Sequence, residues 1–74
     1  MLLSDGTTGN TYIVEKTSLP LKLDKRLEAL GMTKNSSVKI LNKKGHGILI
    51  VKIRGTAFAL GKNVTKNIVV RCAE

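Results

Sequence analysis

The sequence predicts a small, mainly β fold: a strongly bent barrel of about five antiparallel strands with one short α-helix at about residues 21–30. The chain has 74 residues, of which 42% are hydrophobic, so we expect one globular domain over residues 1–74. Five short β-prone runs alternate with turn residues, and one segment has strong helical periodicity. Strands this short and this few favour a sheet that curls into a barrel and hides its own edges.

The first strand is expected at residues 11–15, which are mostly β-branched or aromatic. It follows turn residues at positions 6–10. Pro20 ends the extended stretch, because proline lacks the N–H group that a ladder needs but is tolerated in the first turn of a helix.

The predicted helix carries its own stop signal. Three of its leucines recur at i, i+4 and i+7 and therefore share one face: Leu23, Leu27 and Leu30. Gly31 can adopt the left-handed conformation that ends a helix, and this would place Met32 back over Leu27.

Three further strands are expected to form an antiparallel meander with short turns. They span residues 38–41, 48–54 and 56–60. A single helical turn at residues 64–67 then precedes a closing strand at residues 68–71. We expect Cys72, which shares strand parity with Ile68 and Val70, to be a buried and inert thiol.

The chain is strongly basic, with 13 Lys and Arg residues against five Asp and Glu residues and a net charge of +8. Such a field attracts nucleic acid, an anionic membrane face or an acidic protein. No run approaches the roughly 20 apolar residues that cross a bilayer, and the first residues lack the pattern of a secretion signal. We therefore expect a cytoplasmic protein.

Catalytic groups are sparse in this sequence. It holds one His and one Cys, and no evident Ser-His-Asp set or paired carboxylates. Gly45 and Gly47 lie between two predicted strands, without the following helix that a phosphate-binding loop needs. We expect neither enzymatic activity nor a cofactor.

Three residues are weak candidates for metal ligands. Asp24 and Glu28 stand at i, i+4 and could share a divalent ion, although their basic neighbours favour ordinary solvated acids. His46 follows two lysines closely, and their charges disfavour a cation there. The sequence therefore favours the absence of a metal site.

The strand at residues 48–54 has an unusual outward side. Its alternation sends one set of aliphatic side chains to the interior: Leu49, Val51 and Ile53. Ile48 and Ile50 share the opposite side with Lys52 and Arg54. Either the helix covers these isoleucines, or the strand bends, or they form a docking surface rimmed by lysines. The predicted partner-binding residues are Lys43, Lys44, Ile48, Ile50, Lys52 and Arg54.

Three segments together resemble the FeoA family over nearly the whole chain. They are Arg-Leu-Glu-Ala-Leu-Gly-Met at residues 26–32, the hairpin that ends at Gly55, and Phe-Ala-Leu at residues 58–60 before Ile-Val-Val at residues 68–70. The chain departs from the family pattern at Gly61 and Thr65, where the family usually has Arg and Ala. A partner contact by that Arg therefore does not carry over.

This resemblance implies an SH3-like barrel that acts as a non-enzymatic accessory of bacterial ferrous iron uptake. The implied partner is FeoB, a membrane transporter with a cytosolic GTP-hydrolysing domain. Fe²⁺ would then be associated with the protein only through the transport system, and contact with the membrane would be peripheral.

The alternative is a small basic SH3-like barrel that binds RNA or DNA, for which +8 would suffice. The basic residues are scattered, however, and base stacking needs exposed aromatic rings, of which the sequence offers only Tyr12 and Phe58. Nucleic acid is therefore the less favoured partner.

Overall fold

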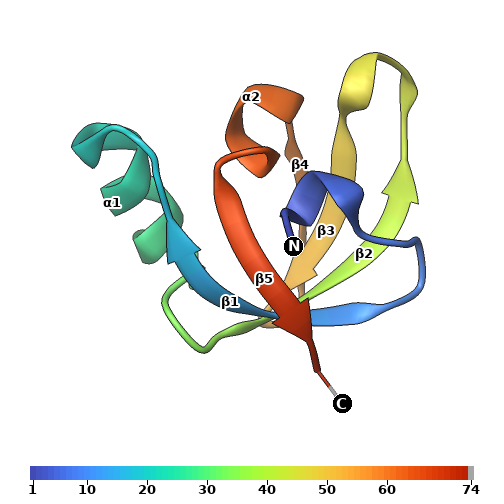
Figure 1. The fold of residues 1–74 in the computed structure, drawn as a ribbon, viewed down its shortest axis with the longest axis horizontal. Helices are drawn as coiled ribbons and strands as arrows, with labels where there is room; N and C mark the ends of the chain where they lie inside the picture. Colours follow the sequence, from blue (N-terminus) through green and yellow to red (C-terminus); the bar gives the residue numbers. More distant parts are fainter. Residues whose placement is uncertain (74) are drawn as a thin grey trace.

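The computed structural model describes residues 1–73. It shows the predicted β-domain, with a short helix packed beside a curled sheet (Figure 1). Five strands form one antiparallel sheet in the order β4-β3-β2-β1-β5. Their bounds are β1 Thr11–Thr17, β2 Ser37–Lys43, β3 Leu49–Ile53, β4 Thr56–Leu60 and β5 Ile68–Cys72. All five lie where the residue patterns placed them; β1, β2 and β5 extend further than expected, and β3 is one residue shorter at each end.

Two α-helical segments and two 3₁₀ turns connect the strands. The helices are α1, Leu21–Ala29, and the single turn α2, Lys62–Thr65, which begins two residues earlier than expected because Gly61 serves as its N-cap. The 3₁₀ turns are η1, Leu3–Asp5, and η2, Gly45–Gly47. Residues of η1 were not predicted to be ordered, yet the Leu3 side chain is fully buried.

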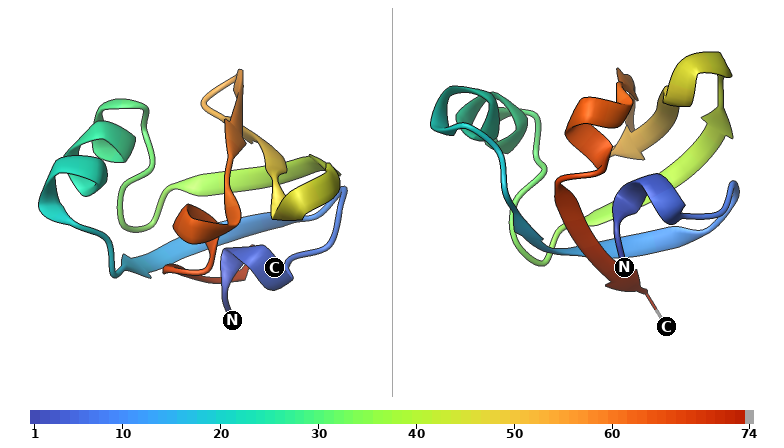
Figure 2. Two further views of the ribbon diagram at one scale, coloured as in Figure 1. Left: turned by 90° about the horizontal axis from the view of Figure 1, so that it is seen from above. Right: turned by 45° about the horizontal axis from the view of Figure 1, so that its top comes forward.

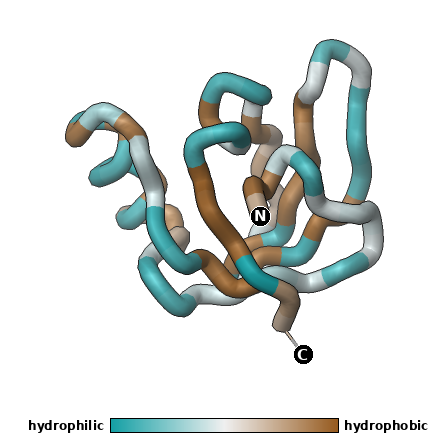
Figure 3. The backbone as a smooth tube through the Cα atoms, in the orientation of Figure 1, coloured by the Kyte–Doolittle hydropathy of each residue, from teal (hydrophilic) through white to brown (hydrophobic). Residues whose placement is uncertain are grey.

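The core is aliphatic and fills the inside of the curled sheet. In Figure 3 the hydrophobic segments concentrate on β5 and on parts of β1 and β3 that turn inward. The buried hydrophobic residues are Leu3, Tyr12, Val14, Leu27, Met32, Val38, Ile40, Leu49, Val51, Ile53, Leu60, Ile68 and Val70. The Thr7 N–H donates a hydrogen bond of 2.8 Å to the Tyr12 hydroxyl, which satisfies this buried group and lowers the pKa of the phenol.

Helix α1 ends as its sequence predicts. Gly31 has φ of +102°, its N–H donates to the Glu28 carbonyl at 3.0 Å, and the Met32 N–H donates to the Leu27 carbonyl at 2.9 Å. These two bonds are the Schellman pattern, and Met32 and Leu27 are both buried. The helix lies beside the end of β1, at one side of the barrel (Figures 1 and 2).

Strands β3 and β4 are joined by the two-residue turn Arg54-Gly55. Both residues have positive φ, +50° and +83°, as a type I′ hairpin turn requires. The Arg54 side chain lies against the stop of α1: a Cβ atom added to Gly31 would be 2.8 Å from Arg54 Cδ. The turn therefore links the hairpin to the helix.

The prediction for Cys72 is wrong, because its side chain is exposed. Cys72 is the cross-strand partner of the buried Tyr12, so the two side chains point to the same, inner side of the sheet. It is the last residue of β5, however, and nothing in residues 1–73 covers that end of the strand.

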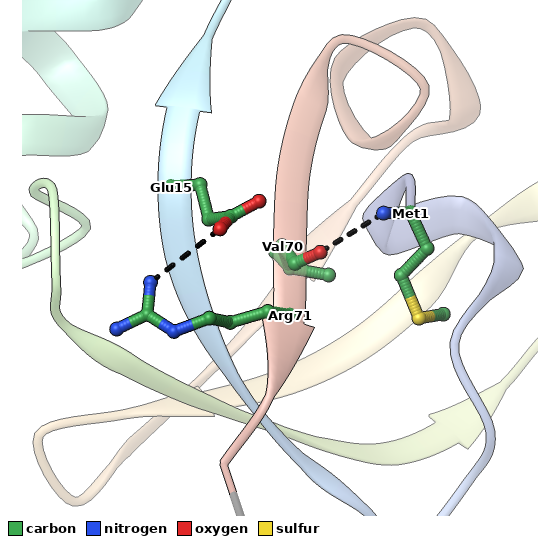
Figure 4. A network of polar contacts seen from close by, with 4 residues as sticks. All are labelled: Met1, Glu15, Val70 and Arg71. Carbon is green, nitrogen blue, oxygen red and sulfur yellow. Dashed lines mark hydrogen bonds and ion pairs between the residues drawn. The ribbon is translucent and has the colours of Figure 1, made fainter.

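The two edges of the sheet differ. The outer edge of β5 is paired with the start of the chain. The Met1 amino group donates to the Val70 carbonyl at 3.0 Å (Figure 4), and the Val70 N–H donates back to the Met1 carbonyl at 2.7 Å. Leu2 forms a bridge with Val69. Strand β4, in contrast, pairs only with β3 among the described residues.

We expect Gly31→Ala to be more destabilising than Gly9→Ala. Both glycines have positive φ, so each substitution should cost about 1–2 kcal/mol from backbone strain. Only Gly31 faces another side chain, and a Cβ there must displace Arg54. Urea unfolding should show the difference, and Arg54→Ala in the same chain should remove it. Equal costs for the two alanines would contradict the contact.

We expect Thr65→Val to stabilise the protein. Thr65 is fully buried and its Oγ1 atom has no hydrogen-bond partner within the described residues. Replacing the hydroxyl by a methyl group of similar size removes an unsatisfied polar atom, which should raise the free energy of unfolding by about 1 kcal/mol. Thr11→Val, at an exposed threonine, is the matched control and should change little. Destabilisation by Thr65→Val would show that the hydroxyl has a partner.

Candidate protein-binding surface

The outward side of β2, β3 and β4 forms a continuous surface, which we call the outer face: Lys39, Leu41, Asn42, Ile50, Lys52, Ala57 and Ala59. The strand register builds it in two rows, because directly paired residues point to the same side of a sheet. Lys39, Lys52 and Ala57 form one row. The second row contains Asn42, Ile50 and Ala59, with Leu41 in the β2 bulge beside them.

Apart from Asn42, the second row is apolar although it faces outward. Ile50 is only half-buried, Ala59 is exposed, and Leu41 is 39% exposed. Leu41 is the extra residue where the β2–β3 register shifts between Ile40 and Asn42. A bulge re-aims side chains in this way, and here it adds a large aliphatic group to the outer face.

The first row places two like charges opposite each other. Lys39 and Lys52 are direct cross-strand partners, and both are exposed. Like charges in that position destabilise a sheet. No acidic side chain of residues 1–73 forms an ion pair with either lysine. The outer face therefore presents uncompensated positive charge beside exposed aliphatic groups.

The structure separates the predicted partner-binding residues into three places. Ile50 and Lys52 lie on the outer face, whereas Arg54 lies at the hairpin turn against Gly31. The other predicted residues lie at the opposite end of β3, around a hollow of about 170 Å³. Its lining is Ser4, Lys43, Lys44, Gly47, Ile48, Leu49 and Lys62.

The prediction for the inward side of β3 is confirmed, because Leu49, Val51 and Ile53 are all buried. Helix α1 does not lie across the middle of β3 and therefore does not cover the outer face (Figures 1 and 2). The idea that α1 packs over Ile48 and Ile50 is thus wrong. The helix lies instead where the β1 strand ends, because Pro20 follows that strand closely in sequence.

The candidate metal ligands are placed as follows. Asp24 and Glu28 line one hollow of about 380 Å³ between α1 and β1, together with Glu15. The Thr17 hydroxyl donates a hydrogen bond of 2.5 Å to Asp24. His46 is exposed in η2, with φ of +63°. Within the described residues, no three His, Cys, Asp or Glu side chains come close enough to hold an ion.

Other polar features of the molecule are weak. Glu15 forms a 3.7 Å ion pair with Arg71 across β1 and β5, with both side chains about half exposed (Figure 4). Pairs of this kind contribute little to stability. Among residues 1–73, no helix is both long enough and apolar enough to span a membrane.

Sequence reasoning missed five residues of the outer face: Lys39, Leu41, Asn42, Ala57 and Ala59. Ala57 and Ala59 could have been found, because alternation on β4 places them outward and a two-residue turn sets their partners on β3. Lys39 could have been found in the same way on β2. Leu41 and Asn42 could not, because nothing local in the sequence marks the bulge that places them opposite Ile50.

Comparison with known proteins gives a consistent result. A family model described as the FeoA domain matches residues 1–72. No curated protein matches the chain. Among solved structures, FeoA from Chlorobium tepidum has a TM-score of 0.93 at 23% identity, over 100% of this chain and 71% of that one.

Two further solved structures extend the comparison. FeoA from Stenotrophomonas maltophilia, a zinc complex of an SH3 domain protein suggested to activate ferrous iron transport, has a TM-score of 0.81 at 30% identity. The match covers 96% of this chain and 89% of that one. A manganese-dependent transcriptional repressor has a TM-score of 0.87 at 20% identity, over 97% of this chain but only 41% of its own length. The barrel is therefore SH3-like, as the sequence resemblance implied.

We expect Lys52→Gln to stabilise the protein at low ionic strength. The substitution removes the repulsion between Lys52 and Lys39, which should add a few tenths of a kcal/mol to the free energy of unfolding. Urea unfolding at low and high salt should show the gain at low salt and its loss at high salt, because ions screen exposed charges. Lys25→Gln, on exposed α1, controls for the lost net charge. An equal gain from both variants would contradict a specific cross-strand repulsion.

Proposed function

The chain belongs to the FeoA family, and from this premise we propose that it is a non-enzymatic, cytosolic protein-binding module of ferrous iron uptake. Its partner would be a FeoB-type membrane transporter. The protein would regulate or assemble that transporter through surface contacts, and Fe²⁺ would be handled by the transporter rather than by this chain.

The outer face is the observation that carries this proposal. It combines a half-buried Ile50 and an exposed Leu41 with two unpaired lysines. Exposed aliphatic groups within a charged rim are typical of protein interaction sites. A cross-strand pair of lysines is unfavourable for the folded chain alone, and an acidic partner surface would turn that repulsion into attraction.

The charge of the whole chain fits a partner at the membrane. With +8 spread over residues on most elements, the protein would be attracted to the anionic cytosolic leaflet by a modest amount for each nearby Lys or Arg. This attraction would raise the local concentration of the module near a transporter without inserting any part of it.

Nucleic acid is less well supported as the partner. Tyr12 is 2% exposed and bonded to Thr7, and Phe58 is half-buried against the core. Small β-barrels hold single strands by stacking bases on exposed rings, but here the Tyr12 ring is buried and Phe58 exposes only part of its ring. Positive charge alone would give salt-dependent contacts with phosphates and no more.

The proposal is tested by an NMR titration of the labelled protein with the soluble cytosolic domain of the cognate transporter. Shifts should appear on the outer face, centred on Ile50 and Lys52. Ferrous ion and generic RNA, each titrated alone, are the controls and should cause no comparable shifts. Strong RNA shifts with a steep salt dependence, and none from the transporter, would reverse the assignment.

We expect Ile50→Asp to reduce transporter binding by at least about tenfold while the chain stays folded, because it places a charge in the apolar centre of the outer face. Leu41→Asp should act in the same direction and is less demanding on the fold, since Leu41 is more exposed. The matched control is Leu21→Asp on α1, where the leucine is 70% exposed and far from the outer face.

Calorimetry measures the affinity, and circular dichroism checks the fold. Unchanged affinity for both outer-face variants would contradict the proposed surface. Unfolding caused by Ile50→Asp, with normal binding by Leu41→Asp, would instead assign Ile50 to stability.

A further inference from the structure

Strand β4 has a free edge that lacks the usual protection. Natural sheets guard an edge with a charged residue, a proline, a bulge or a covering segment. β4 reads Thr-Ala-Phe-Ala-Leu, and its register with β3 continues without a break from Thr56 to Leu60. The other edge of the sheet, on β5, is covered by Met1 and Leu2. Of the two edges of the sheet, the one at β4 is therefore open and the one at β5 is covered.

The hairpin turn determines which backbone groups point outward along this edge. In a two-residue hairpin the residues that flank the turn, Ile53 and Thr56, form a hydrogen-bonded pair, and the pairs then alternate. Thr56, Phe58 and Leu60 thus bond to β3, whereas the N–H and C=O groups of Ala57 and Ala59 point away from it.

No other described segment uses these groups. Among residues 1–73, the backbone hydrogen bonds outside the strand ladders do not include Ala57 or Ala59. Both residues are exposed. The N–H and C=O groups of Ala57 and Ala59 are therefore free to bond to a further strand, and they have the two-residue spacing that strand pairing requires.

The side chains along the edge supply an anchor and a charge. Phe58 is paired with the buried Val51 and packs against the core, but it is only half-buried, so part of its side chain is exposed. Ala57 is the direct partner of Lys52, and Arg54 precedes the strand while Lys62 follows it. The edge is uncharged itself and flanked by three basic residues.

We infer that β4 accepts an extended, acidic segment of the partner protein as an additional strand of the sheet. The backbone of the segment would bond to Ala57 and Ala59, an apolar side chain would contact Phe58, and acidic side chains would approach Lys52, Arg54 and Lys62. This inference rests on the proposed function, since the partner is the transporter of the previous section.

Charge selects this occupant over a second copy of the chain. Each copy carries +8, and pairing two β4 edges would bring the flanking basic residues of both copies together. An acidic segment gains from the same residues. The edge also adjoins the outer face through Ala57 and Ala59, so one partner can use both surfaces.

The test measures amide hydrogen exchange, resolved to single residues, with and without the full-length transporter in nanodiscs. The amides of Ala57 and Ala59 should exchange quickly in the free protein and at least about tenfold more slowly in the complex. Those of Thr56, Phe58 and Leu60 should be protected in both states. Binding should weaken as salt increases, because the contact is between opposite charges.

Proline variants test the donors directly. Ala57→Pro and Ala59→Pro each remove an outward N–H without removing a bond to β3, which an edge strand tolerates. Together they should weaken binding by about tenfold or more. Ala57→Ser and Ala59→Ser alter the same two side chains but keep both N–H groups, so they should weaken binding much less than the proline pair does. Circular dichroism verifies that all variants are folded.

The outcomes separate the two proposals. Transporter binding with unchanged exchange at Ala57 and Ala59, or with normal affinity of folded proline variants, overturns the added strand and leaves the proposed function in place. Protection that grows with protein concentration in the absence of transporter assigns the edge to a second copy and overturns the inference. Absence of any transporter binding overturns both.

Discussion

The type I′ turn at Arg54-Gly55 is the constraint on which the functional surfaces depend. Two consecutive positive φ values join β3 to β4 through the shortest possible loop, and this fixes the register of every pair from Ile53 and Thr56 to Leu49 and Leu60. The register decides which side chains reach the core, which reach the outer face, and which backbone groups remain at the edge. A slip of one residue would exchange the inner and outer sides of β4.

The turn also couples the sheet to the helix. Arg is not a residue favoured at positive φ, yet its side chain at position 54 lies over Gly31, where α1 stops. The Schellman bonds at Glu28 and Leu27 hold that stop in place and return Met32 to the core. One short contact thus joins the segment that ends the helix to the segment that sets the hairpin.

Several features of this molecule are unfavourable for an isolated domain and favourable for a bound one. Lys39 and Lys52 repel each other, Ile50 and Leu41 face outward, and the edge of β4 lies open. All three lie on adjoining strands on one side of the barrel, while the start of the chain closes the opposite edge. Their proximity is the basis of the proposed role in binding another protein.

Local patterns in the sequence determined the elements of this protein. Alternating aliphatic residues predicted β3, the leucine spacing predicted α1, and Gly31 and Met32 predicted its end, because each signal acts between residues close in the chain. Tertiary structure alone decided the bulge at Leu41, the exposure of Cys72 and the place of α1 beside β1. These depend on which strands pair and where the core ends, and such contacts between distant residues leave no mark on any single segment.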